Sequence, residues 1–270
     1  MSCTPSWMVR WQEASELAQH SGFSSVEWET GFFHLRGFLR ILKEPSDLLV
    51  VYIEGDGRAW LNQRTPSKNP SPTNPIALKL ALQDPSSKVL YVSRPCQFVD
   101  NISKECDVRY WTSHRYSQEV IVAMARVIDV VKAQTKTDSI ALVGYSGGGT
   151  VATLIARERK DIAWLLTIAA NLDVAMWTKW HGVSSMPDSL DPAEDTSTLQ
   201  HIPQIHFIGA QDRIVPPEVT YAFQNKFADP KTISVRVIAS FDHQCCWVKE
   251  WPRILSKIHA NFDLIKNFKN

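Results

Sequence analysis

The sequence predicts an α/β fold: a mostly parallel, doubly wound sheet with helices on both faces. Two observations predict it. Short continuous apolar runs recur along the chain, as expected of strands that are buried on both faces of a sheet. Segments with helical periodicity separate these runs, and such an alternation implies right-handed crossovers within one sheet. At 270 residues, length alone would allow one large domain or two small ones.

The predicted strands fall into two kinds. The first, at residues 32–41, alternates loosely and is rich in aromatic residues, which favours an antiparallel strand or hairpin near a sheet edge. The continuous apolar runs follow it and predict parallel strands at 48–53, 89–92, 140–143, 162–168, 205–208 and 233–238.

The clearest predicted helix has one apolar stripe at helical spacing. Its members are Val120, Ile121, Met124, Val127, Ile128 and Val131. Further helices are expected at 75–83, 147–157, 217–227 and 246–262. Residues 171–200 mix Pro, Asp, Ser and Trp without a strong period, and we expect a short lid-like insertion there, over one end of the sheet. The succession of strands and helices favours a single domain over residues 1–270.

The composition excludes several classes of protein. Hydrophobic residues make up 44% of the chain and charged residues 21%, which suits a globular protein rather than a disordered one or a coiled coil. With 29 Lys and Arg against 28 Asp and Glu, the net charge of +1 lacks the basic excess that nucleic-acid binding needs. No segment approaches the roughly 18 apolar residues of a transmembrane helix, and residues 1–7 do not begin a recognisable signal peptide. The composition indicates no oligomeric state.

A candidate nucleophile follows the predicted strand 140–143. Residues 144–148 read Gly-Tyr-Ser-Gly-Gly and place Ser146 between a predicted strand and a predicted helix, as in a G-x-S-x-G nucleophile elbow. Such a turn brings the two backbones close, so side chains two residues on either side of the serine would clash. The alternative is a glycine-rich turn with a phosphate site at the helix N-terminus, although no lysine follows as in a P-loop.

A serine hydroxyl needs a base within hydrogen-bond reach, and the base needs a carboxylate to orient it. In the chain order that accompanies this motif, both partners lie downstream of the serine. His243 follows the last predicted strand, where such sheets place their sites, whereas His206 lies within an apolar strand and is expected in the core. Asp212, which follows the strand 205–208, is the predicted acid, and Asp173 is its competitor one strand earlier.

A tetrahedral intermediate needs two backbone donors for its oxyanion. The N–H of Gly147, directly after the nucleophile, is the first candidate. The second should come from the loop after the strand 48–53, where the glycines of Glu54-Gly-Asp-Gly57 let the backbone turn inward. The N–H of Asp56 is the predicted donor, and a plain turn is the alternative.

These motifs, in this order, resemble the α/β-hydrolase superfamily over about residues 32–262. They are Glu54-Gly-Asp-Gly57, Gly144-Tyr-Ser-Gly-Gly148, Gly209-Ala-Gln-Asp212 and His243. Residues 94–97, 106–112 and 171–181 more closely resemble a group of uncharacterised bacterial hydrolases, many of them exported. The resemblance implies the α/β-hydrolase fold. The sequence departs from the family at 54–57, where many esterases carry His-Gly.

The resemblance also implies a serine hydrolase of carboxylesterase or lipase type that acts on a small-molecule acyl substrate. An ester, a thioester or an amide would be cleaved through an acyl-enzyme by the triad Ser146, His243 and Asp212, without a metal or an organic cofactor. The alternatives are a cofactor-free acyltransferase with the same triad and a non-catalytic binding protein on the same fold.

Two aromatic residues are candidates for the substrate pocket. Tyr145, next to the nucleophile, lines the pocket or supports the elbow. Trp177, in the insertion, forms part of an apolar lid or packs the insertion onto the body. The sequence leaves both alternatives open.

The five cysteines include two candidate pairs. Cys96 and Cys106 flank a polar stretch that a disulfide can close, with two free thiols as the alternative. A disulfide there would favour an exported, periplasmic bacterial protein. For the adjacent Cys245 and Cys246, we expect two buried thiols rather than a vicinal disulfide.

Overall fold

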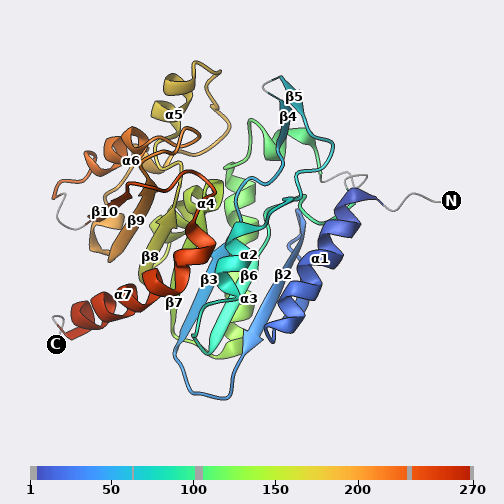
Figure 1. The fold of residues 1–270 in the computed structure, drawn as a ribbon, viewed down its shortest axis with the longest axis vertical. Coiled ribbons are helices and arrows are strands. Elements are labelled where there is room, and N and C mark those ends of the chain that lie inside the picture. The colour runs from blue at the N-terminus through green and yellow to red at the C-terminus, as the bar shows by residue number, and fades with distance from the viewer. Residues whose placement is uncertain (1–4, 63, 101–105, 230–232, 268–270) are drawn as a thin grey trace.

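The computed structural model describes residues 5–62, 64–100, 106–229 and 233–267. Within these residues the main sheet has eight strands in the order β1-β2-β6-β3-β7-β8-β9-β10 (Figure 1). The strands are β1 (Ser24–Glu29), β2 (His34–Ile41), β3 (Leu48–Ile53), β6 (Lys88–Val92), β7 (Ser139–Tyr145), β8 (Ile162–Ile168), β9 (Gln204–Gly209) and β10 (Ile233–Ile238). From β6 to β10 all neighbours are parallel, while β1 and β2 are antiparallel at one edge. The predicted, mostly parallel sheet is confirmed.

Helices cover both faces of this sheet. One face packs against α1 (Ser6–His20), α2 (Ile76–Ala81) and α7 (Trp247–Asn267), and Figure 1 looks onto that face. The other face packs against α3 (Gln118–Thr135), α4 (Gly147–Arg157) and α6 (Pro217–Gln224). The apolar stripe predicted for residues 120–131 is the buried side of α3.

Residues 171–200, where we expect an insertion, are largely without regular structure. They contain α5 (Val174–His181) and two single turns of 3-10 helix, η2 (Pro192–Glu194) and η3 (Leu199–His201). A third such turn, η1 (Val108–Trp111), precedes α3, and a two-stranded sheet of β4 (Trp60–Asn62) and β5 (Thr65–Pro66) follows β3.

The burial of each strand explains its sequence pattern. Strands β3, β6 and β7 are buried almost throughout, which is why residues 48–53, 89–92 and 140–143 within them are uninterrupted apolar residues. The edge strand β1 is mostly exposed. Within the described residues, no helix combines the length and the apolarity needed to cross a membrane.

Candidate active site

Strand β7 and helix α4 meet at Ser146 in a strained turn. Ser146 has φ 51° and ψ −126°, a conformation that costs a non-glycine residue about 1–3 kcal/mol. A Cβ on Gly144 would overlap the backbone at the start of α4, and one on Gly148 would overlap the backbone at the end of β3. The two glycines therefore allow the close approach that the elbow motif requires.

The structure brings the predicted serine, histidine and aspartate together. His243 follows β10 and places Nε2 3.0 Å from Oγ of Ser146. Its Nδ1 lies 2.8 Å from Oδ2 of Asp212, which follows β9. The other Asp212 oxygen accepts hydrogen bonds of 2.8 Å from the backbone N–H groups of Ile214 and Val215. Because the Asp212 side chain is fully buried, these contacts fix both the acid and the imidazole that it faces.

The competing residues have other roles. Asp173 caps α5, and its carboxylate accepts a hydrogen bond of 2.7 Å from the backbone N–H of Met176. His206 is fully buried within the sheet between Thr167 and Gln204, and burial lowers its pKa to about 3. His206 is thus a neutral core residue, as expected.

Tyr145 both lines the site and supports it. Its hydroxyl donates a hydrogen bond of 3.0 Å to the backbone carbonyl of His243. Its ring lies 5.5 Å from the imidazole and forms part of the cavity wall. Tyr145 therefore has both kinds of role that the sequence left open: it lines the pocket, and it supports the site through the histidine loop.

The loop after β3 lies directly beside the nucleophile. A Cβ added to Gly55 would lie 3.3 Å from the Cβ of Ser146. The Asp56 carboxylate packs against Gly147, in the space that a side chain at residue 147 would need. The two backbone segments expected to hold the oxyanion are thus adjacent.

The Asp56 side chain forms a network that no local sequence motif signals. It accepts hydrogen bonds from Arg115 (2.9 Å), Arg94 (3.2 Å) and the hydroxyl of Tyr116 (3.3 Å). Burial raises the pKa of Asp56, but the charges of Arg115 and Arg94 outweigh it and hold that pKa below its usual value. The carboxylate is therefore ionised and anchored from several sides.

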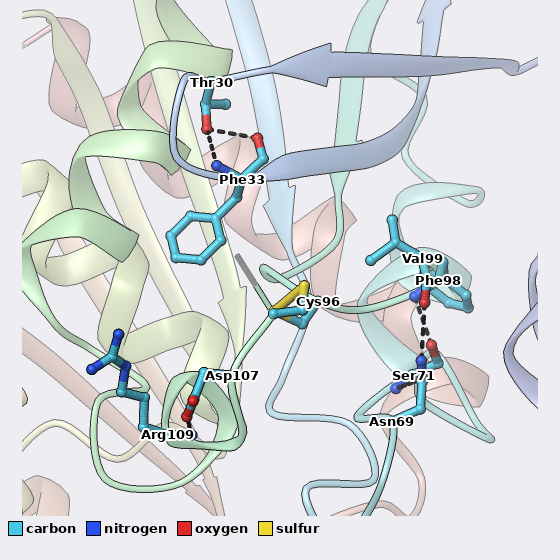
Figure 2. The surroundings of a disulfide bond; sticks show 10 residues. Thr30, Phe33, Asn69, Ser71, Cys96, Phe98, Val99, Asp107 and Arg109 are labelled. Carbon is cyan, nitrogen blue, oxygen red and sulfur yellow. Dashed lines mark hydrogen bonds between the residues drawn. A yellow bond between two sulfur atoms is a disulfide. The ribbon is translucent and has the colours of Figure 1, made fainter. Parts of the chain in front are cut away.

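A disulfide secures the segment that carries Arg94. Cys96 is bonded to Cys106, with the two Cα atoms 5.4 Å apart, and residues 101–105 between them lie outside the described residues. Figure 2 shows this bond near Phe33, and beyond it Phe98 hydrogen-bonded to Ser71. Next to the disulfide, the Gln97 side chain donates a hydrogen bond of 2.9 Å to the carbonyl of Gly55. The disulfide thus lies between two residues that hold the loop beside the nucleophile.

The expectation of two buried thiols at Cys245 and Cys246 is wrong. The structure joins these cysteines in a disulfide, and Cys245 is exposed. The physical reason is the turn after His243, in which the Asp242 carboxylate accepts hydrogen bonds from the backbone N–H groups of Gln244 and Cys245. That turn directs Cys245 to the surface and not into the core.

A cavity of about 400 Å³ surrounds Ser146. Trp177 lines it, and the indole N–H of Trp177 donates a hydrogen bond of 2.7 Å to the carbonyl of Ile214. Helix α5 is therefore tied to the loop that carries Asp212, so Trp177 both holds α5 against that loop and contributes to the pocket. The volume suits a small-molecule substrate.

Comparisons with known proteins identify similar sequences and folds. The model of a family described as "Serine hydrolase (FSH1)" matches residues 73–237, more than half of the chain. The matched segment includes Ser146 and Asp212 and ends before His243. No curated protein sequence matches this chain.

Solved structures share the fold at low sequence identity. The α/β-hydrolase GrgF from Penicillium sp. sh18 is 13% identical with a TM-score of 0.62, over 89% of this chain and 97% of that chain. A serine hydrolase homologue from Coxiella burnetii is 17% identical with a TM-score of 0.58, over 88% of this chain and 96% of that chain. Est1E from Butyrivibrio proteoclasticus is 14% identical with a TM-score of 0.58, over 89% of this chain and 99% of that chain. The fold is that of the α/β-hydrolases.

Proposed function

Because the chain belongs to the serine hydrolase (FSH1) family, we propose that it cleaves a carboxylic ester, a thioester or an amide through an acyl-enzyme on Ser146. One observation supports this most strongly. A strained serine faces a histidine nitrogen at 3.0 Å, and a buried aspartate holds the other nitrogen of that histidine at 2.8 Å. That geometry suits nucleophilic catalysis.

In the first half-reaction, Oγ of Ser146 attacks the acyl carbon while Nε2 of His243 takes the hydroxyl proton. Asp212 accepts the Nδ1–H of His243, which keeps Nε2 free to act as the base and stabilises the imidazolium that forms. When the intermediate collapses, the bond to the leaving group breaks and His243 returns the proton to that group. In the second half-reaction, His243 takes a proton from a water molecule while the water oxygen attacks the acyl carbon. The bond to Oγ of Ser146 then breaks, and His243 gives the proton to Oγ, which releases the acid and restores the free serine.

The negative charge that develops on the carbonyl oxygen needs donors beside Ser146. We propose the backbone N–H groups of Gly147 and Asp56 for this role, because the loop after β3 lies against the elbow. The Asp56 carboxylate would itself oppose a nearby anion, and its pairing with Arg94 and Arg115 offsets that repulsion.

Hydrolysis of p-nitrophenyl esters of increasing chain length, with aminoacyl anilides beside them, tests this function. We expect Ser146→Ala and His243→Ala to lose nearly all activity. The matched control His201→Ala changes an exposed histidine away from the cavity and should keep the wild-type rate. Full activity in Ser146→Ala would rule out the proposed nucleophile.

A further inference from the structure

Two arginines, Arg58 and Arg115, line the cavity beside Ser146. The single carboxylate of Asp56 pairs with two guanidinium groups, those of Arg94 and Arg115. Within the part of the chain that the structure describes, neither arginine pairs with another carboxylate. Arg58 also lines the cavity, is exposed, and forms no ion pair with a described residue. The cavity lining therefore holds the guanidinium groups of Arg58 and Arg115, while Arg94 lies outside the lining and pairs with Asp56.

Arg115 lines the cavity and keeps one side-chain donor that forms no hydrogen bond with a described residue. Its Nε donates a hydrogen bond of 2.7 Å to the carbonyl of Thr112, and its Nη1 donates to Asp56. Tyr116 lies beside the guanidinium as well. A guanidinium has five N–H donors in a planar fork, so these neighbours leave at least one donor on Nη2. Arg115 lines the same cavity as Ser146 and is not sealed off, because 11% of its side chain is exposed.

Few negative charges in the cavity would repel an anion. Among the described residues, its acidic lining consists of Glu54 and Asp56. Asp56 is neutralised by its two arginines. Glu54 is almost fully buried and faces the backbone N–H groups of Gly55 and Leu78. An anionic group that entered the cavity would therefore meet Arg115 and Arg58 without a competing free carboxylate.

We propose that the cavity selects esters that bear a carboxylate, and that Arg115 binds this carboxylate while Arg58 adds attraction at longer range. The inference rests on the proposed hydrolase function and narrows its substrate class. Guanidinium groups bind carboxylates through charge-assisted and often bidentate hydrogen bonds, which are stronger than neutral ones. Arg115 is in this account a substrate-binding residue that also anchors Asp56. The carboxylate belongs either to the acyl chain or to the leaving group.

Two pairs of substrates that differ by one charge test the proposal and distinguish these sources. For the acyl side, p-nitrophenyl hydrogen adipate is compared with its neutral methyl ester. For the leaving group, the butyryl ester of 4-hydroxybenzoic acid is compared with that of methyl 4-hydroxybenzoate. At low ionic strength we expect kcat/KM to be about tenfold higher for the anionic member of one pair, which corresponds to a single charge-assisted hydrogen bond. Added salt should reduce this preference.

Arg115→Gln should bring the preferred pair to about equal kcat/KM, measured as the ratio within the pair so that any general loss of activity cancels. Arg109→Gln, which removes an exposed arginine of the same segment outside the cavity, is the matched control and should keep the preference. If Arg115→Gln does not fold, competitive inhibition of the wild type by adipate, against none by adiponitrile, which is uncharged and carries no ester, supplies the same test.

Equal kcat/KM within both pairs for the wild type would overturn the inference and leave the hydrolase function standing. A wild type that hydrolyses none of the four esters and does not react with a fluorophosphonate would instead contradict the proposed function itself.

Discussion

The orientation of a single imidazole depends on one carboxylate in this site. Asp212 accepts from His243 at 2.8 Å and is itself held by two backbone N–H groups. We expect Asp212→Asn to lower kcat by about 10⁴, because an amide can donate to Nδ1 and so favours the wrong tautomer. Steady-state ester hydrolysis measures the loss.

Asp173→Asn is the matched control for that variant. Asp173 caps α5, and asparagine caps helices about as well as aspartate, so activity should stay within about twofold of the wild type. If Asp173→Asn proved more harmful than Asp212→Asn, the assignment of the acid would be wrong.

Glu54 predicts a pH dependence of stability. Burial raises its pKa from 4.5 to about 7, against the opposing effect of the hydrogen bonds donated by Gly55, Ala77, Leu78 and Tyr91. Between these pH values the unfolded chain has released the proton and the folded chain retains it. The free energy of unfolding therefore loses about 3 kcal/mol from this group as the pH rises from 4.5 to above 7.

Urea denaturation of the wild type and Glu54→Gln at several pH values checks this loss. As the pH rises over that range, the free energy of unfolding of the wild type should fall by about 3 kcal/mol relative to that of Glu54→Gln, because glutamine does not titrate. A difference that does not change with pH would show that Glu54 titrates normally.

At the residue scale, the sequence made the catalytic candidates predictable for a topological reason. Ser146, Asp212 and His243 each follow a strand of the parallel part of the sheet, and the carboxyl ends of such strands meet at one edge. Arg115 gave no such signal. Its contact with Asp56 joins positions 59 residues apart and depends on how the segment before α3 folds back, which no local pattern specifies.

At the scale of elements, residues 94–97 link the disulfide to the site. Arg94 and Gln97 both hold the loop beside Ser146, and Cys96 lies between them. Without the disulfide, the unfolded chain gains conformational entropy between residues 96 and 106. The double variant Cys96→Ser with Cys106→Ser should therefore have a free energy of unfolding that is lower by about 3 kcal/mol. It should also have a lower kcat/KM, because Asp56 loses part of its support.

Thermal and urea unfolding of this double variant measure the change, and Cys3→Ser is the matched control for replacing a cysteine. Equal stability of the double variant and the wild type under non-reducing conditions would contradict a structural role for the disulfide.

The elements that the sequence predicts most clearly are the deeply buried ones. The strands that cross the core are uninterrupted apolar runs, so their positions were predictable. No prediction covered the region of α1 and β1. Among the residues of α1 only Ala14 and Ala18 are fully buried, and β1 has no fully buried residue, so neither has a strong apolar pattern.

At the scale of the whole molecule, a disulfide bears on the compartment. Such bonds persist in oxidising surroundings, and from the Cys96–Cys106 disulfide we propose that the protein is exported. Fractionation of the native host tests it, since recovery of the protein only from the cytosol would contradict export.

Labelling with a fluorophosphonate shows whether this fold presents one activated serine, Ser146. The probe reacts with a serine only where a base and an oxyanion site activate it. We expect one probe per folded wild-type chain, located on Ser146 by peptide mass spectrometry, and none on folded Ser146→Ala. No labelling of the folded wild type, or undiminished labelling of Ser146→Ala, would contradict the account.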